Sequence, residues 1–224
     1  MQEFLLKLTA ALLLTIAVVL TSVQIMVNND HFFAWQFIKN DVTKQTKIEH
    51  SELMRILDEI QAYLFGRRAD FIIYGEIAGE RRQVFNAREI AHMHDVRVLF
   101  KYGIILRNSC ALVGGILLFT LWRKKKELLF NTLFFSALVF LILALVGGLL
   151  LYFDFNRYFV LFHEIFFTND LWILDPRTSI LINMVPIEFF ISIVKAIGLI
   201  SVSGMLLIGA LGALGKYRLR SRQL

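Results

Sequence analysis

Residues 123–153 read RKKKELLFNTLFFSALVFLILALVGGLLLYF, and this stretch decides the fold class. After Glu127 it continues for 26 residues without a charged side chain. About 20 such residues are enough to cross a hydrocarbon core of ~30 Å. Backbone groups inside a bilayer must pair within their own segment, so the stretch is predicted to form a transmembrane helix. The basic cluster in front of it is typical of a cytoplasmic flank.

Three further apolar stretches predict three more membrane spans. They lie at residues 4–27, 103–122 and 187–214. Together with residues 128–153, they give four predicted spans. The first is longer than the apolar region of a signal peptide, and no small-x-small cleavage site follows it. Of the 224 residues, 57% are hydrophobic and 19% are charged, below the roughly 25% of soluble domains. We therefore expect an all-α membrane protein with four transmembrane helices.

The distribution of charge predicts how the chain crosses the membrane. The formal net charge is +6, yet residues 28–102 hold 11 basic and 11 acidic residues. The basic excess lies in the loop 123–127 and the tail 215–224, which the positive-inside rule places in the cytoplasm. Both termini are then cytoplasmic, and the loops 28–102 and 154–186 are extracellular. We expect the basic residues to contact anionic lipid and expect no nucleic-acid partner.

The two outer loops are predicted to form a small, mainly helical extracellular cap. An apolar stripe predicts a helix from Ser51, as N-cap, to Phe65. Residues 70–74 and 83–85 could pair as a short β-hairpin around Gly75–Gly79. Asn86 and Glu89 form a capping-box pattern that opens a helix leading into the second span.

The second outer loop is aromatic, with nine aromatic residues in the 21 from Tyr152 to Trp172. One interpretation is an interfacial belt with packing under the cap. Most of these rings are phenylalanines, which lack the polar group that draws Tyr and Trp to the head-group level. The other interpretation is therefore an apolar pocket for substrate, for which the candidates are Phe155, Phe159, Phe162, Phe166 and Phe167.

The five histidines are the candidates for chemistry, because the imidazole titrates near neutral pH. All of them lie in the two outer loops. His92 and His94 share one face only on a strand, and the capping pattern favours a helix, where they point apart. His92 then shares a face with Asp95, which could orient it. No HExxH motif or set of further ligands is present, so we expect no metal, and the single Cys110 is interpreted as a packed, unreactive residue.

The heights of two histidines raise a geometric question. His163 lies ten residues after the third span and His92 lies eleven before the second. If both helices continued, both rings would stand ~15 Å beyond the hydrocarbon edge. That is high for a lipid-processing site. Either a helix breaks and folds down, or Lys101 and Arg107 mark a deeper interface.

No nucleophile elbow, phosphate loop or SxxK motif is present. The residues alone leave several functions open. One is a non-enzymatic membrane scaffold or accessory protein with an extracellular cap. Another is a lipid-modifying enzyme or membrane protease that uses the histidines. A transporter is disfavoured, because the spans lack paired acids and broken helices.

Three segments resemble the lipoprotein intramolecular transacylase family of Gram-positive bacteria. They are EIAHMHDVRVLF at 89–100, FHEIFFTNDLWILDP at 162–176 and LINMVPIEFF at 181–190. The resemblance implies a bacterial plasma-membrane enzyme that needs no cofactor. Its partner would be a lipoprotein with an N-terminal diacylglyceryl-cysteine, and it would move the sn-2 acyl chain to the cysteine α-amine.

The resemblance also implies two catalytic histidines, which fall on His92 and His163. Around them we expect residues that bind or orient the substrate, although each also has a structural interpretation as packing, ion pairing or turn chemistry. These candidates are Asp95, Arg97, Phe162, Phe166, Phe167, Asn169, Asp170, Trp172 and Asp175.

Overall fold

The computed structural model describes residues 1–221, so the last three residues of the predicted basic tail lie outside the described residues. The chain forms two compact units. The first comprises residues 1–24, 104–154 and 195 onward, and the second comprises residues 25–103 and 155–194. Each unit is built from segments that are distant in the sequence.

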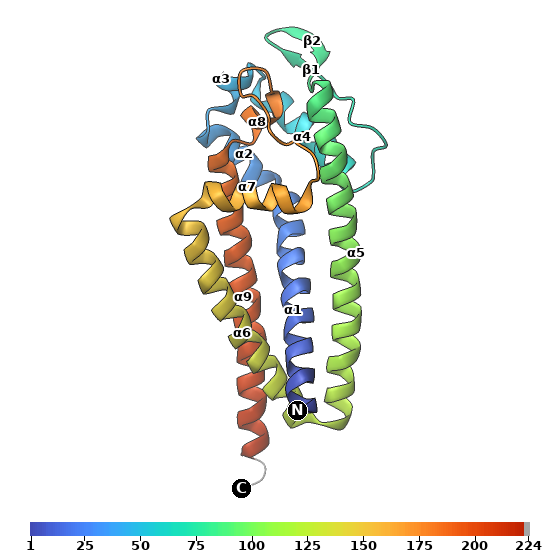
Figure 1. The fold of residues 1–224 in the computed structure, drawn as a ribbon, viewed down its shortest axis with the longest axis vertical. Coiled ribbons are helices and arrows are strands. Elements are labelled where there is room, and N and C mark those ends of the chain that lie inside the picture. Colours follow the sequence, from blue (N-terminus) through green and yellow to red (C-terminus); the bar gives the residue numbers. More distant parts are fainter. Residues whose placement is uncertain (222–224) are drawn as a thin grey trace. The chain divides into compact units, whose positions relative to one another are not determined.

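Within residues 1–221, four helices are long and apolar enough to cross a membrane. They are α1 (Gln2–Val27), α5 (Ala87–Lys124), α6 (Lys126–Phe153) and α9 (Ile187–Arg220) (Figure 1). The predicted fold class, an all-α protein with four membrane-spanning helices, is thereby confirmed. With 38 residues, α5 greatly exceeds the ~20 needed for a span. Its first sixteen residues, 87–102, precede the apolar stretch and belong to the second unit.

The first unit packs through small residues and a leucine cluster. A Cβ atom added to Gly212 on α9 would lie 2.8 Å from the carbonyl oxygen of Phe130 on α6, so only glycine permits this close approach. Lys125, between α5 and α6, lies 3.9 Å from the carboxylate of Glu3, near the start of α1. The leucine cluster comprises Leu121, Leu128 and Leu129, with Leu6, Leu118, Phe130 and Leu133 packed against it.

The second unit is mostly helical and carries one small sheet. Its elements are α2 (Asp30–Lys39), α3 (Val42–Thr46), α4 (His50–Leu64), β1 (Tyr74–Ile77), β2 (Glu80–Gln83), α7 (Phe155–Phe166) and α8 (Ile180–Met184), with the outer end of α5 and the start of α9. Its core is aromatic and aliphatic, and the rings of Phe71 and Phe85 stack with centroids 4.8 Å apart. Leu53, Ile56 and Leu57 of the predicted stripe on α4 are buried.

Two local boundaries differ from the sequence-based prediction. The α4 helix begins at His50 with Glu49 as N-cap, so Ser51 lies inside it. The hairpin exists, but its strands are 74–77 and 80–83, with the turn at Ala78 and Gly79. Both turn residues have positive φ, 55° and 83°, which is the backbone of a tight two-residue hairpin turn. The predicted turn, Gly75–Gly79, contains the observed one but is too wide, because Gly75 lies in β1, where the glycine permits a close approach to Val84 and to Ile56 of α4.

The helix of the third span does not continue to His163. The α6 helix ends at Phe153, Asp154 adopts φ −152° and ψ 76°, and a separate helix, α7, begins at Phe155. By contrast, α5 continues without interruption from Ala87 through the apolar stretch. The alternative that a helix breaks is therefore correct for His163, and the assumption of a continuous helix is wrong.

Candidate active site

His92 is positioned by the capped first turns of α5. The backbone N–H of Glu89 donates to the side chain of Asn86 at 3.1 Å, and the Glu89 carboxylate accepts from the N–H of Asn86 at 2.6 Å. This is the reciprocal capping box that the sequence predicted. His92 follows one turn later and points into the second unit, with 8% of its surface exposed.

His92 and His163 form a buried pair of imidazoles, which we call the histidine pair. Their ring centroids are 6.3 Å apart with an interplanar angle of 33°. His163, on α7, is also 8% exposed. Phe167 lies against both rings, with centroid distances of 5.4 Å to His92 and 5.6 Å to His163. The two imidazoles are therefore enclosed together by apolar side chains, although His92 and His163 are 71 positions apart in the sequence.

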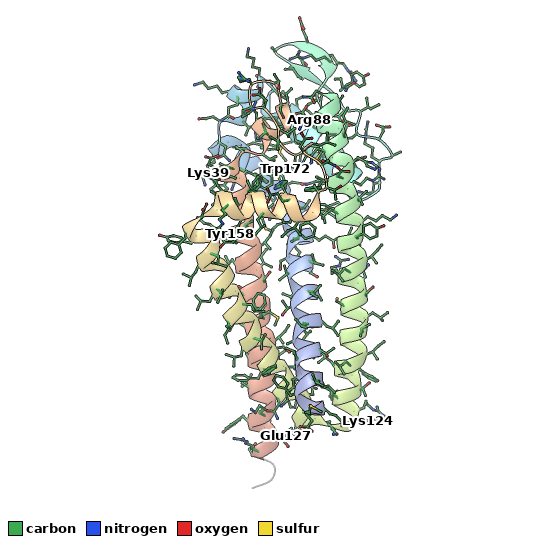
Figure 2. The ribbon with its side chains drawn as sticks, in the orientation of Figure 1. Lys39, Arg88, Lys124, Glu127, Tyr158 and Trp172 are labelled. Carbon is green, nitrogen blue, oxygen red and sulfur yellow. The ribbon has the colours of Figure 1, made fainter. Side chains whose placement is uncertain are left out.

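Aromatic rings surround His163. Phe159, one turn earlier on α7, lies with its centroid at 4.4 Å, and Phe162 lies at 5.4 Å. The ring of Trp172, a residue labelled in Figure 2, covers another side of His163, and the two ring centroids are 4.8 Å apart with an interplanar angle of 31°. These contacts restrict the ring to one orientation and exclude water from most of it.

The hydrogen bonding of His163 defines its tautomer. Its Nδ1 lies 2.7 Å from the carbonyl oxygen of Phe159. A carbonyl oxygen can only accept, so Nδ1 carries the proton and the neutral ring presents an unprotonated Nε2. Such an Nε2 is a proton acceptor.

His92 is different, because its buried Nδ1 has no hydrogen-bond partner among the described residues. Burial lowers the pKa of His92 to about 4, with a further lowering by His163 and an opposing contribution from Asp95. Burial also lowers the pKa of His163, while the bond to the Phe159 carbonyl opposes that shift. Both imidazoles are therefore neutral near pH 7.

A groove of about 220 Å³ adjoins the histidine pair. Phe167, which touches both imidazoles, forms part of its wall. Polar groups lie at Asp95, Tyr102, Thr168 and Asn169, and the remaining wall is apolar. The complete lining is Asp95, Val98, Leu99, Tyr102, Phe166, Phe167, Thr168 and Asn169. A larger hollow of about 370 Å³, beside Asp30 and Arg67, contains none of the predicted site residues.

The loop 167–179, between α7 and α8, is attached to α5 at several points. The amide of Asn169 donates to the Asp95 carboxylate at 2.9 Å. Arg88, labelled in Figure 2, donates to the backbone carbonyl of Asp170 and, at 3.2 Å, to that of Ile173. Asp95 therefore pairs with Asn169 of this loop.

The structure does not bring every candidate to the histidine pair. Arg97 donates to the carbonyl of Ala69 at 2.7 Å and lies over the ring of Tyr63. The carboxylate of Asp175 binds Arg177, which lowers the pKa of Asp175 to about 2. These contacts are structural, and roles for Arg97 and Asp175 in substrate binding stay predictions.

Sequence reasoning assigned no site role to Glu89 or Ser179, which lie in or next to this arrangement, whereas Phe159 was among the phenylalanines expected to line a pocket or pack under the cap. The carboxylate of Glu89 accepts from the hydroxyl of Ser179 and the N–H of Leu181, both at 2.7 Å. The capping pattern identified Glu89, but only as a helix start. Nothing in the sequence pointed to contacts across ninety residues.

Metal ligation finds no support in the arrangement of side chains. Across residues 1–221, no three His, Cys, Asp or Glu side chains gather in a way that could hold a metal ion. His94 is exposed while His92 is buried, which agrees with the helix and not with a chelating strand.

Comparison with solved structures places this fold among integral membrane proteins. The lipoprotein intramolecular transacylase Lit from Bacillus cereus matches with a TM-score of 0.85 at 20% identity, covering 98% of each chain. Structures of the same Bacillus cereus protein with one histidine replaced by alanine or by arginine match with TM-scores of 0.76 and 0.77 at 21% identity. These two matches cover 98% and 99% of this chain, and 96% and 95% of theirs. Comparison with curated proteins finds no match.

The fold and the four spanning helices thus define a multi-pass integral membrane protein. The family described as lipoprotein intramolecular transacylase Lit matches residues 8–190, most of the chain. The chain belongs to this family.

Proposed function

We propose that this protein transfers the sn-2 acyl chain of a diacylglyceryl-cysteine lipoprotein to the α-amine of the same cysteine, using the histidine pair as its acid and base. The observation that carries the proposal is the burial of two neutral imidazoles side by side, His92 and His163, in a member of a transacylase family. The product is an N-acyl lipoprotein with a free hydroxyl on its glyceryl group.

The main requirement of the reaction is to orient the amine and the ester, because the transfer itself is energetically favourable. Attack of the amine on the ester carbonyl closes a ring of N, Cα, Cβ, S, two glyceryl carbons, the ester oxygen and the carbonyl carbon. Such eight-membered rings close poorly in solution, so holding the two ends together supplies much of the rate. Conversion of an ester to an amide is downhill, so no nucleotide or acyl carrier is required.

A single proton has to be moved. The N–C bond forms as the amine loses a proton, and the C–O bond breaks as the glyceryl oxygen gains one. The unprotonated Nε2 of His163 suits the first step. The proton taken by His163 then passes to His92, which, with its pKa lowered to about 4, is a strong acid once protonated and suits the second step. A pair that begins neutral can take the proton and return it.

The surroundings of the pair suit an ester that must not be hydrolysed. The rings of Phe159, Phe167 and Trp172 exclude water from His163. The apolar wall of the groove, with Phe166 exposed along it, suits one acyl chain. Asp95, Asn169 and Thr168 at its polar part suit the cysteine or glyceryl atoms. Phe162 and Asp170 are proposed to shape this site through His163 and Arg88.

The second unit is proposed to lie on the extracellular side, with both termini in the cytoplasm. The basic residues between α5 and α6 and at the end of α9 support this orientation through the positive-inside rule. The substrate would then reach the histidine pair on the extracellular side of the membrane, the side on which exported lipoproteins are anchored by their lipid.

The test is expression in a bacterium whose lipoproteins carry only the diacylglyceryl group. Tandem mass spectra of one lipoprotein's N-terminal peptide are compared for the wild type, His92→Asn and His163→Asn, each with confirmed membrane expression. We expect an N-acyl product with the total number of acyl chains unchanged, and its loss in both variants. An unmodified amine with both chains still on glycerol would overturn the proposal.

A further inference from the structure

Glu89 is a buried acidic residue that the proposed mechanism does not use. Its side chain is on α5, one turn before His92, and only 1% of the residue is exposed. A buried carboxylate must have its oxygens satisfied by donors, since leaving them unpaired is costly. The donors that satisfy Glu89 therefore indicate what the residue does.

Capping explains only one of the three hydrogen bonds that the carboxylate accepts. One carboxylate oxygen, Oε2, accepts from the N–H of Asn86 at 2.6 Å, as in any capping box. The other, Oε1, accepts from the hydroxyl of Ser179 and the N–H of Leu181, both at 2.7 Å. A cap alone would leave Oε1 to water, whereas here it is bonded to a segment ninety residues away.

Ser179 is the point at which the loop 167–179 ends and α8 begins. It is 2% exposed, and its hydroxyl oxygen also accepts from the N–H of Ile182 at 3.3 Å as the N-cap of α8. The other end of the loop is Phe167, the residue in contact with both imidazoles. Between them lies Trp172, stacked on His163.

The remaining attachments of this loop are exposed. Arg88 and Asp170 have side chains that are 42% and 77% exposed, and pairs of that kind contribute little in water. Hydrogen bonds to a buried carboxylate are stronger and leave a larger penalty when one partner is removed. Glu89 is therefore the dominant attachment of the loop to the helix that carries His92.

We infer that Glu89 is a positioning residue for the histidine pair: its carboxylate fixes the loop 167–179 so that Phe167 and Trp172 hold the imidazole of His163 facing His92. The inference rests on the proposed function for its catalytic consequence. Its structural consequence, the stacking of Trp172 on His163, can be measured without any reaction.

The test uses the intact protein purified in detergent, in a form where Trp35 and Trp122 are replaced by phenylalanine. Emission then comes from Trp172, and a protonated imidazole quenches indole emission more than a neutral one. Titration of emission against pH reports the contact between Trp172 and His163. Turnover is measured in parallel with a synthetic diacylglyceryl lipopeptide.

Glu89→Gln is the informative variant, because it keeps the shape of the side chain. Its single carbonyl oxygen can face either Asn86 or Leu181, and its NH₂ group then faces the other backbone N–H. We expect loss of the pH-dependent quenching and a fall in kcat of roughly ten- to a hundredfold, since small misplacements of reacting groups have effects of this size. Ser179→Ala removes one of the three donors and should give a smaller change in the same direction.

Glu164→Gln is the matched control, because Glu164 is an exposed acid next to His163. It should leave quenching and turnover unchanged. The inference is overturned if Glu89→Gln retains the pH-dependent quenching and kcat within twofold of the wild type. If Glu89→Gln does not fold, Ser179→Ala decides, and unchanged stacking there overturns the inference. Failure of the proposed function would appear separately, as activity that persists in His92→Asn and His163→Asn.

Discussion

His163 donates its Nδ1 proton to the carbonyl oxygen of Phe159, one turn earlier on the same helix, at 2.7 Å. The acceptor is a backbone atom, so substitution of the Phe159 side chain leaves it in place. The unprotonated Nε2 of His163 is therefore set by the helix itself, and it gives the ring its proposed role as proton acceptor.

The proposed role of His163 as proton acceptor predicts that a base added in solution can replace its imidazole ring. In His163→Ala, transfer should fall about 10²- to 10⁴-fold, the usual contribution of a general base. Free imidazole should restore part of the rate, whereas it should not restore His163→Phe, which fills the space. The measurement is N-acyl lipopeptide formed by purified protein against imidazole concentration. Equal activity of His163→Ala and wild type would contradict the role.

His94 provides the control for His92. The two residues lie two positions apart on α5, and His94 is exposed while His92 is buried. We expect His94→Ala to keep its turnover within about twofold, and His92→Ala to lose ~10²-fold or more, because only His92 lies beside His163. Kinetics of the two variants with one lipopeptide substrate would decide. An equal loss in both would reverse the assignment.

The buried imidazoles should make the fold sensitive to acid. The folded pKa of His92 is lowered to about 4 from 6.5, so between these values the unfolded chain binds a proton that the folded chain excludes. The free energy of unfolding therefore falls as the pH falls through this window, and His163 acts in the same direction. Unfolding in detergent at pH 7.5, 6 and 5 would measure this loss.

The control for this acid sensitivity is the His92→Asn/His163→Asn double variant, which has no ring to protonate at either position. Its stability should decline less between pH 7.5 and 5 than that of the wild type. Equal declines in the two proteins would assign the effect to other groups.

The contact between Asp95 and Asn169 should affect substrate binding more than stability. Their hydrogen bond of 2.9 Å is exposed, so its loss should change stability by about 1 kcal/mol or less. Both residues line the groove, so Asp95→Asn and Asn169→Ala should each raise KM. The double variant should show less than the combined effect, since the two side chains act through one contact. Additive effects would indicate that each residue acts alone.

The sequence predicted those parts of the fold that depend on residues close together in the chain. Runs of apolar residues predict spans because a bilayer demands helices, and the pattern at Asn86 and Glu89 predicted the start of α5 correctly. The hairpin was displaced because Gly75 was interpreted as a turn residue. The glycine instead permits a close approach to Ile56. This is a tertiary contact, which the local sequence pattern does not reveal.

The site was predicted only in part for the same reason. His92 and His163 were singled out by their chemistry and by resemblance, and the structure places their rings together. The attachment of Glu89 to Ser179 and Leu181 depends on how a loop returns to a helix ninety residues earlier. Such pairings follow from the packing of the whole unit. The residue types alone, glutamate and serine, do not indicate which residue each will bind.

The interruption at Asp154 separates two requirements that a continuous helix would combine. A straight extension of α6 would displace His163 by 1.5 Å for every residue added to the span. With α7 as a separate helix, the imidazole is located by its contacts with Phe167 and Trp172 instead. The distance between the two imidazoles is therefore set by contacts within the second unit and not by the number of residues in the third span.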